Sequence, residues 1–280
     1  MFADDIKLFS VLNSIEDSAS LQRSLDGVSR WCDENFMQLN AKKSMVMSFH
    51  RGEEFVHANY YIQGVGLQRV QVVKDLGVHL NHALSPDHHI DIICAKANRL
   101  LGLLSRTARS GLSTHSISIL YKSLLRPILE YASVVWNPYY QHHIIRLERI
   151  QGRFVRLVGT TLGFLFHEVP VDDVMKQFNL CPLEVRRELA DLAFLSRLIN
   201  GSLDCPDLLA MINFRIPRTT RSTELFVRKY YRTNYLKNGP MARLHSIGNC
   251  VPAELDLFCT NLKTLKKKWV SLYVDRGECG

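Results

Sequence analysis

Two adjacent carboxylates, Asp4 and Asp5, stand between apolar residues close to the first residue of the chain. They follow Phe2-Ala3 and precede the strand-like run Ile6-Lys7-Leu8-Phe9. Adjacent Asp residues on a tight β-turn can point toward one place and hold hard divalent cations, which prefer carboxylate oxygen and bridge to phosphates in nucleotidyl transfer. The same pair is also typical of a solvated turn or a helix N-cap. The pair alone leaves both interpretations open.

The charge of the chain favours a polyanionic partner. Its 280 residues are 46% hydrophobic and carry a net charge of +8, with a pI near 9.2. Lys and Arg neutralise phosphates and release counterions, so nucleic acid is favoured over a membrane surface. The longest apolar stretches are shorter than the ~20 residues of a membrane span, and no signal peptide pattern is present. We therefore expect an intracellular protein, nuclear or cytoplasmic, with no membrane partner.

The cysteines indicate neither a zinc site nor a disulfide framework. The chain has 7 of them, widely scattered, with no C-x-x-C pair. An odd number at irregular spacing is typical of reduced thiols in the cytosol or nucleus. The adjacent histidines His88-His89 and His142-His143 would point about 100° apart on a helix, which argues against a shared metal.

The first 80 residues predict a mixture of helix and strand. Apolar residues at helical spacing predict an amphipathic helix over 17–36, with Asp17 or Ser18 as its cap. Short apolar runs predict strands at 45–49, 60–62, 70–73 and 76–78.

After Pro86 the apolar residues recur at 3.6-residue spacing and predict long helices. Pro127 lacks a backbone donor and should kink or restart the helix that precedes it. Pro182 and Gly201 bracket another helix, since Pro is favoured at helix starts and Gly just past helix ends. The apolar stripe near the C-terminus predicts a last helix from Pro252.

One predicted helix, over 141–158, carries arginines within roughly a quarter of its circumference. Four guanidinium groups on one face could follow a phosphate backbone. The alternative is the ordinary solvated face of a packed helix. The residues are Arg146, Arg149, Arg153 and Arg156.

Two further regions are basic. The lysines at 263 and 266–268 crowd the last predicted helix and are typical of a solvated face. The stretch from Arg215 to Tyr235 interleaves arginine and lysine with tyrosine, as single-stranded nucleic-acid surfaces do. Its low periodicity is equally compatible with a poorly ordered connector.

In their order along the chain, these segments resemble the reverse transcriptase of jockey-like and other non-LTR retrotransposons, entered halfway through. Phe2-Ala3-Asp4-Asp5 resembles the family's aromatic-Ala-Asp-Asp box. The run from Trp31-Cys32 through Leu39-Asn40 to Lys43-Ser44 resembles its next helix-to-strand motif, and Lys74-Asp75-Leu76-Gly77-Val78 resembles the turn that grips the primer end. The likeness continues through Leu120-Tyr121-Lys122-Ser123-Leu124 and Val135-Trp136-Asn137-Pro138, and it covers nearly the whole chain.

The resemblance implies roles for particular residues. In a complete enzyme, Asp4 and Asp5 would bind Mg²⁺, and Lys43 would steady or protonate the leaving pyrophosphate. Leu76 and Gly77 would contact the primer, and the arginine face over 146–156 would contact nucleic acid. The implied partners are an RNA template, a DNA primer and deoxynucleoside triphosphates. Nothing in the sequence indicates an oligomeric state.

The resemblance implies an α+β fold in three parts: a partial palm over 1–85, a helical thumb over 86–200 and a basic helical extension over 201–280. It also implies that the fingers and the strand with the first catalytic Asp precede Met1. Two-metal transfer needs carboxylates from both strands, so we expect the chain alone to be inactive. The alternative is a nucleic-acid-binding or interaction protein that keeps the thumb's basic faces without chemistry.

Overall fold

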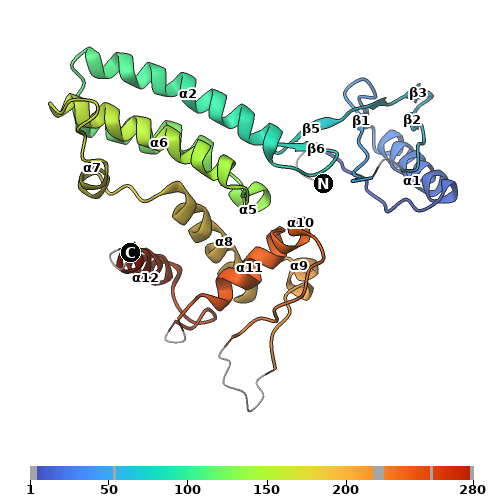
Figure 1. Cartoon of the computed structure of the whole chain (residues 1–280). Helices are drawn as coiled ribbons and strands as arrows, with labels where there is room; N and C mark the ends of the chain where they lie inside the picture. Colours follow the sequence, from blue (N-terminus) through green and yellow to red (C-terminus); the bar gives the residue numbers. More distant parts are fainter. Residues whose placement is uncertain (1–4, 53–54, 217–223, 253–254, 278–280) are drawn as a thin grey trace. The chain divides into compact units, whose positions relative to one another are not determined.

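The computed structural model describes residues 5–52, 55–216, 224–252 and 255–277 (Figure 1). The chain divides into two compact units, Met1–His88 and His89–Gly280. The first unit mixes helix and strand, and the second is mainly helical. The predicted α+β class is therefore confirmed. The expected boundary after residue 200 stays a prediction.

The first unit opens with helix α1(Ile15–Glu34). The cap is Ser14, and the prediction of Asp17 or Ser18 was wrong by three or four residues. The Asp17 N–H donates to Ser14 Oγ at 3.3 Å, while Asp17 Oδ2 accepts from the Ser14 N–H at 3.0 Å. This reciprocal capping box satisfies two orphan donors, which explains why the helix begins at Ile15.

Short strands follow α1 in the first unit. They are β1(Met45–Val46), β2(Tyr61–Ile62), β3(Val65–Gly66), β4(Gln68–Arg69), β5(Val72–Asp75) and β6(Val78–Asn81). β1 pairs with β4 in parallel, whereas β2–β3 and β5–β6 are antiparallel hairpins. Within the described residues these pairs form three separate two-stranded sheets.

The second unit is built from helices of very different length. They are α2(Asp87–Arg109), α3(Thr114–Leu120), the π-helical turn η1(Tyr121–Leu125), α4(Arg126–Glu130), α5(Ser133–Trp136), α6(Gln141–Thr161), α7(Val171–Gln177), α8(Leu183–Ile199), α9(Pro206–Ala210), α10(Asn234–Lys237), α11(Pro240–Asn249) and α12(Leu262–Gly277). The predicted restart at Pro127 is present only as a change of helix type, since α3, η1 and α4 follow one another without a gap. The π turn ends at Leu125, and α4 starts with the proline in its first turn.

Helices α2 and α6 lie side by side in the second unit and run in the same direction (Figure 1). Their apolar residues pack inward: Ile90, Ala97 and Leu104 of α2 are buried, as are Leu147 and Phe154 of α6. This burial fixes which face of α6 remains exposed.

A second core surrounds α8, with α11 and α12 packed against it (Figure 1). Leu192 and Leu195 of α8 share this core with Phe226, Leu244 and Trp269. The last helix begins at Leu262, so the predicted start at Pro252 was wrong. Leu255 and Leu257, which precede it, are nevertheless buried in the same core.

Gly248 of α11 allows the close packing of Phe226. A Cβ atom at this position would lie 2.3 Å from Phe226 Cε2 and 2.9 Å from Leu195 Cδ2. We expect Gly248→Ala to lower the free energy of unfolding by about 1–3 kcal/mol, because overpacking outweighs the gain in helix propensity. Urea unfolding measures this change.

Gly152→Ala in α6 is the matched control. The nearest atom to its new Cβ would be Arg156 Nη1, at an ordinary 3.7 Å. We expect no loss of stability, since alanine is the better helix former. Equal unfolding midpoints for the Gly248→Ala variant and the unchanged chain would contradict this account of the core.

Candidate functional site

The structure describes one carboxylate of the predicted metal pair. Asp5 is exposed, whereas Asp4 lies outside the described residues. In the described part of the chain, no group of three or more His, Cys, Asp or Glu side chains is arranged to hold a metal ion. Carboxylate oxygen suits Mg²⁺, but a single carboxylate does not make a magnesium site.

The segment after Asp5 is tied to the β5–β6 hairpin. Lys7 forms an ion pair with Asp75, the last residue of β5. Asp75 stands opposite Val78, so Leu76 and Gly77 form the two-residue turn between the strands. The structure thus brings the Asp5 segment and the predicted primer-contacting turn into one part of the first unit.

The turn itself has an unusual residue at its first position. Both turn residues have positive φ, +43° at Leu76 and +89° at Gly77. This combination is typical of a type I′ turn, in which Asn, Asp or Gly usually precedes the glycine. A leucine there is strained, and its side chain is 46% exposed. The hairpin therefore presents an apolar side chain at its tip.

Lys43 lies in a separate turn. It is exposed, and its N–H donates to Asn40 O at 3.0 Å and to Asn40 Oδ1 at 3.2 Å, two residues before β1. Among the described residues, no hydrogen bond or ion pair links Lys43 with Asp5. The predicted role of Lys43 at the leaving pyrophosphate stays a prediction.

Three arginines of α6 are exposed and Arg156 is half-buried, and two of the four also contact α2. Arg146 forms an ion pair with Asp91, and this hydrogen bond raises the pKa of the Arg146 guanidinium. Arg153 Nη1 donates to Asn98 Oδ1 at 3.2 Å. These contacts stand seven residues apart on both helices, and they link α2 and α6 along the rim of their interface.

The other two arginines differ from each other. The Arg156 guanidinium lies 5.8 Å from the centre of the Phe166 ring, within the range of a cation–π contact. Arg149 is exposed, and no hydrogen bond or ion pair identified in the described chain involves it. Arg149 is therefore the arginine of this face with the most freedom to bind a phosphate.

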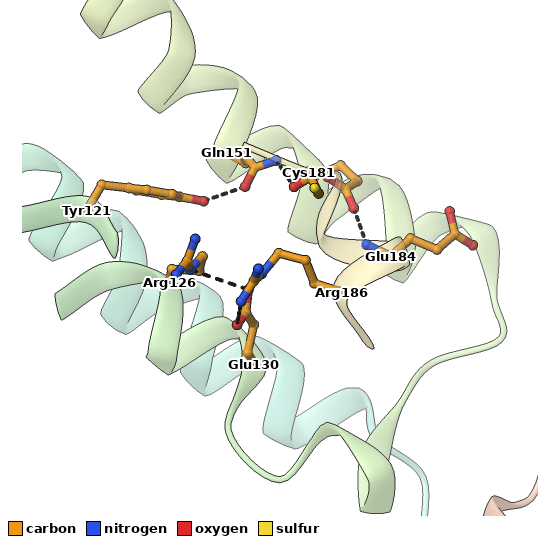
Figure 2. A network of polar contacts seen from close by, with 8 residues as sticks. Tyr121, Arg126, Glu130, Gln151, Cys181, Glu184 and Arg186 are labelled. Atoms are coloured by element: carbon orange, nitrogen blue, oxygen red, sulfur yellow. Dashed lines mark hydrogen bonds and ion pairs between the residues drawn. The ribbon is translucent and has the colours of Figure 1, made fainter. Parts of the chain in front are cut away.

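A network of buried polar side chains that sequence reasoning missed fixes α6 against η1 and α8 (Figure 2). Tyr121 of η1 donates to Gln151 Oε1 at 2.6 Å, and Gln151 Nε2 donates to Cys181 O at 3.0 Å. The Tyr121 ring stacks on Phe154 at 4.0 Å, and burial raises the pKa of its hydroxyl. The sequence signal for this network was Gln151, a polar residue among the apolar residues on the buried face of α6.

Ion pairs and a helix cap complete this network (Figure 2). Arg186 of α8 binds both oxygens of Glu130 in α4, and Arg126 approaches the same carboxylate at 3.7 Å. Glu148 of α6 accepts the Glu184 N–H at 2.7 Å, so it caps the first turn of α8. Burial raises the pKa of Glu148, and hydrogen bonds from the backbone N–H groups of Glu184 and Leu183 oppose that rise. The network links α6, the helix with the arginine face, to η1 and to the start of α8.

A second buried network joins α8 to α11. Asp191 of α8 accepts from Arg243 Nε at 3.0 Å and from Asn137 Nδ2 at 3.2 Å. Arg187, only 1% exposed, donates from Nε to Asn137 Oδ1 at 3.0 Å. Arg243 also donates to Val134 O at 2.8 Å. Charged residues at apolar positions of α8 were the sequence signal for this network.

Comparisons with known proteins give one informative similarity. The chain is 29% identical over 162 residues to a Drosophila melanogaster protein described as "Probable RNA-directed DNA polymerase from transposon X-element". The aligned part covers 56% of this chain and 18% of that protein. The similarity supports a reverse-transcriptase-like origin for the chain.

Two further comparisons, with family models and with solved structures, found no match. Among the described residues, no helix has the length and apolar character needed to cross a membrane. Because the chain spans about 18% of the relative's length, the activity, substrates and partners of the whole relative are proposals for this chain.

Proposed function

We propose that the chain is part of the RNA-directed DNA polymerase of a jockey-like non-LTR retrotransposon, beginning at the aromatic-Ala-Asp-Asp box. Residues 1–85 are a partial palm, 86–200 a thumb-like region and 201–280 a basic extension. The ion pair between Lys7 and Asp75 carries the proposal, because it holds the segment after Asp5 against the hairpin that resembles the primer grip. The similarity to the X-element polymerase supports the same assignment.

Exposed apolar residues of the first unit support a role within a larger enzyme. Phe9 is 94% exposed, Val11 77% and Ile15 75%. Three large apolar side chains this exposed within seven residues would favour a further surface that covers them, if they form one patch. In the complete polymerase a further strand would pair with residues 6–10, and neighbouring segments would cover these side chains.

The residues of the metal site have defined roles in this proposal. In the complete enzyme, Asp4 and Asp5 would bind Mg²⁺, the ion that neutralises developing phosphate charge. Lys43 would contact the phosphates of the deoxynucleoside triphosphate, and Leu76 and Gly77 would contact the primer. A further carboxylate must come from another segment, so the chain alone does not polymerise.

The arginine face of α6 would contact the phosphates of the RNA template and DNA primer. Arg149 is exposed, and Arg146 and Arg153 are held in place by Asp91 and Asn98. Fixed guanidinium groups lose less side-chain entropy on binding than free ones. Phosphate contacts carry no base information, so this binding should be independent of sequence.

Salt dependence tests this contact. We expect the chain to bind a primed RNA template with an affinity that falls linearly on a log–log plot against salt, by about 0.7–0.9 for each phosphate neutralised. Arg149→Gln should reduce the magnitude of that slope by about 0.7–0.9, the contribution of one phosphate. Fluorescence anisotropy with a labelled template–primer, across a range of salt concentrations, measures both values.

Arg197→Gln is the matched control, since Arg197 is an exposed arginine in the last turn of α8, outside the arginine face. It removes the same charge from the chain and should leave the slope unchanged. Equal slopes for the Arg149→Gln variant and the unchanged chain would mean that the α6 face is only a solvated surface.

A further inference from the structure

Residues 227–232 form an irregular segment, and the chain contacts α11 before it at Phe226 and after it at Asn238. At the first end, Phe226 is fully buried, and its N–H donates to Asn249 Oδ1 at 2.8 Å. Asn249 Nδ2 donates in turn to Phe226 O at 3.0 Å. The chain therefore enters the 227–232 segment from a fixed point in the core.

The second end leads directly into α10. Thr233 caps this helix, accepting the Leu236 N–H at 3.4 Å. Arg243 of α11 donates from Nη1 to Asn238 O at 3.1 Å, just after α10, and it also forms the ion pair with Asp191. With both ends held, the segment loses less conformational entropy on binding a ligand than a free loop would.

The 227–232 segment presents an aromatic ring among cations. Tyr230 is 91% exposed, and Arg228, Lys229 and Arg232 are exposed beside it. Arg228 Nη2 lies 2.5 Å from Glu224 Oε1, which orients its guanidinium while 74% of its side chain stays exposed. Burial of the faces of a tyrosine ring is favourable, and here the ring is almost fully exposed to solvent.

We propose that this segment binds single-stranded nucleic acid, with Tyr230 stacking on a base and Arg228, Lys229 and Arg232 contacting phosphates. Stacking needs an unpaired base, since the faces of paired bases are covered by their neighbours, which distinguishes this site from the duplex contact proposed for α6. The four residue steps from Arg228 to Arg232 can span at most roughly 14 Å, the length of a few nucleotides. The inference rests on the proposed function only for the nature of the partner.

The combination of ring and charge favours this ligand over others. An acidic peptide would satisfy the cations but would make no use of an exposed ring face. The flat faces of nucleobases and the regular charge of their backbone match both features together. The site is separate in sequence from α6 and lies in the region that follows α9.

The test uses the full chain and a short labelled RNA, either single-stranded or annealed to complementary DNA. Tyr230→Ala should weaken binding of the single strand about 10-fold and change binding of the hybrid less than 2-fold, following the usual effect of removing one stacking ring. Tyr230→Phe should retain binding, because it keeps the ring. Circular dichroism should be unchanged, since the side chain is exposed.

Phe36→Ala is the matched control. Phe36 is 97% exposed, and its neighbours Asn35 and Met37 carry no charge. It should leave single-strand binding unchanged. A similar loss of single-strand affinity in both alanine variants would mean that any exposed ring contributes. That result would overturn the assignment of a binding site at Tyr230.

The two proposals fail in different ways. If Tyr230→Ala leaves single-strand affinity unchanged while the hybrid still binds through Arg149, only the present inference is overturned. If the chain binds neither RNA nor hybrid, both are overturned. Binding of a poly-glutamate peptide that falls with Tyr230→Ala, without RNA binding, would identify an acidic protein as the partner and overturn the nucleic-acid assignment.

Discussion

Asp191→Ala is expected to lower the free energy of unfolding by about 3–5 kcal/mol. The Asp191 and Arg243 side chains are only 3% and 16% exposed, so the change leaves one guanidinium largely buried without its counter-ion. Asn137 donates to the same carboxylate and accepts from the fully buried Arg187. The change therefore also removes the contact that orients Asn137 toward Arg187. Chemical denaturation followed by circular dichroism measures the loss.

Asp91→Ala is the matched control for this prediction. It breaks another ion pair of the second unit, with Arg146, but those side chains are 57% and 44% exposed. An exposed pair contributes about 0–1 kcal/mol, because water screens it. Equal losses in the two variants would show that burial does not set the importance of the Asp191 pair.

The buried pair also shows what such contacts do and do not provide. Burial raises the pKa of Asp191, and the hydrogen bond from Arg243 only partly opposes that rise. Desolvation therefore consumes much of the attraction between the charges, and the pair is weak evidence of net stability. The pair links α8 to α11, the helix whose Asn249 binds Phe226 at the start of the 227–232 segment.

The long helices could be predicted from sequence because their apolar residues repeat at 3.6-residue spacing over several turns. The helix over 141–158 corresponds to α6, and Ile90, Ala97 and Leu104 of α2 are buried as their spacing indicated. The change from π-helical to α-helical bonding lies beside Pro127, where the missing backbone donor predicts a disturbance of the helix. In these cases a local property of the residues determines the structure.

The remaining elements depend on contacts between distant segments. Helix α11 lies after a stretch with little periodicity, and its Gly248 is explained only by the Phe226 ring that it accommodates. Leu255 is buried by tertiary packing although it precedes α12, so an apolar stripe was mistaken for continuous helix. The contact between Lys7 and Asp75 spans 68 residues, and no local pattern could reveal it.

Asp5→Asn is expected to reduce primer extension by several orders of magnitude, about 10³-fold or more, in a polymerase completed by the upstream part. The amide keeps the shape of the side chain but removes the negative charge that would balance Mg²⁺. The chain alone should incorporate no nucleotide above background. Incorporation of a labelled deoxynucleotide on a primed RNA template, with Mg²⁺ present, measures both quantities.

Asp26→Asn separates loss of a metal ligand from a general loss of charge. Asp26 is an exposed carboxylate of α1 that accepts from Gln22 Nε2 at 2.7 Å, and its replacement should leave extension nearly unchanged. The hairpin held by Lys7 and Asp75 should keep its structure in both variants, because neither substitution touches that ion pair. A completed enzyme that tolerates Asp5→Asn as well as Asp26→Asn would reduce the Asp-Asp pair to a solvated turn. Extension by the isolated chain would instead show that it holds a complete metal site of its own.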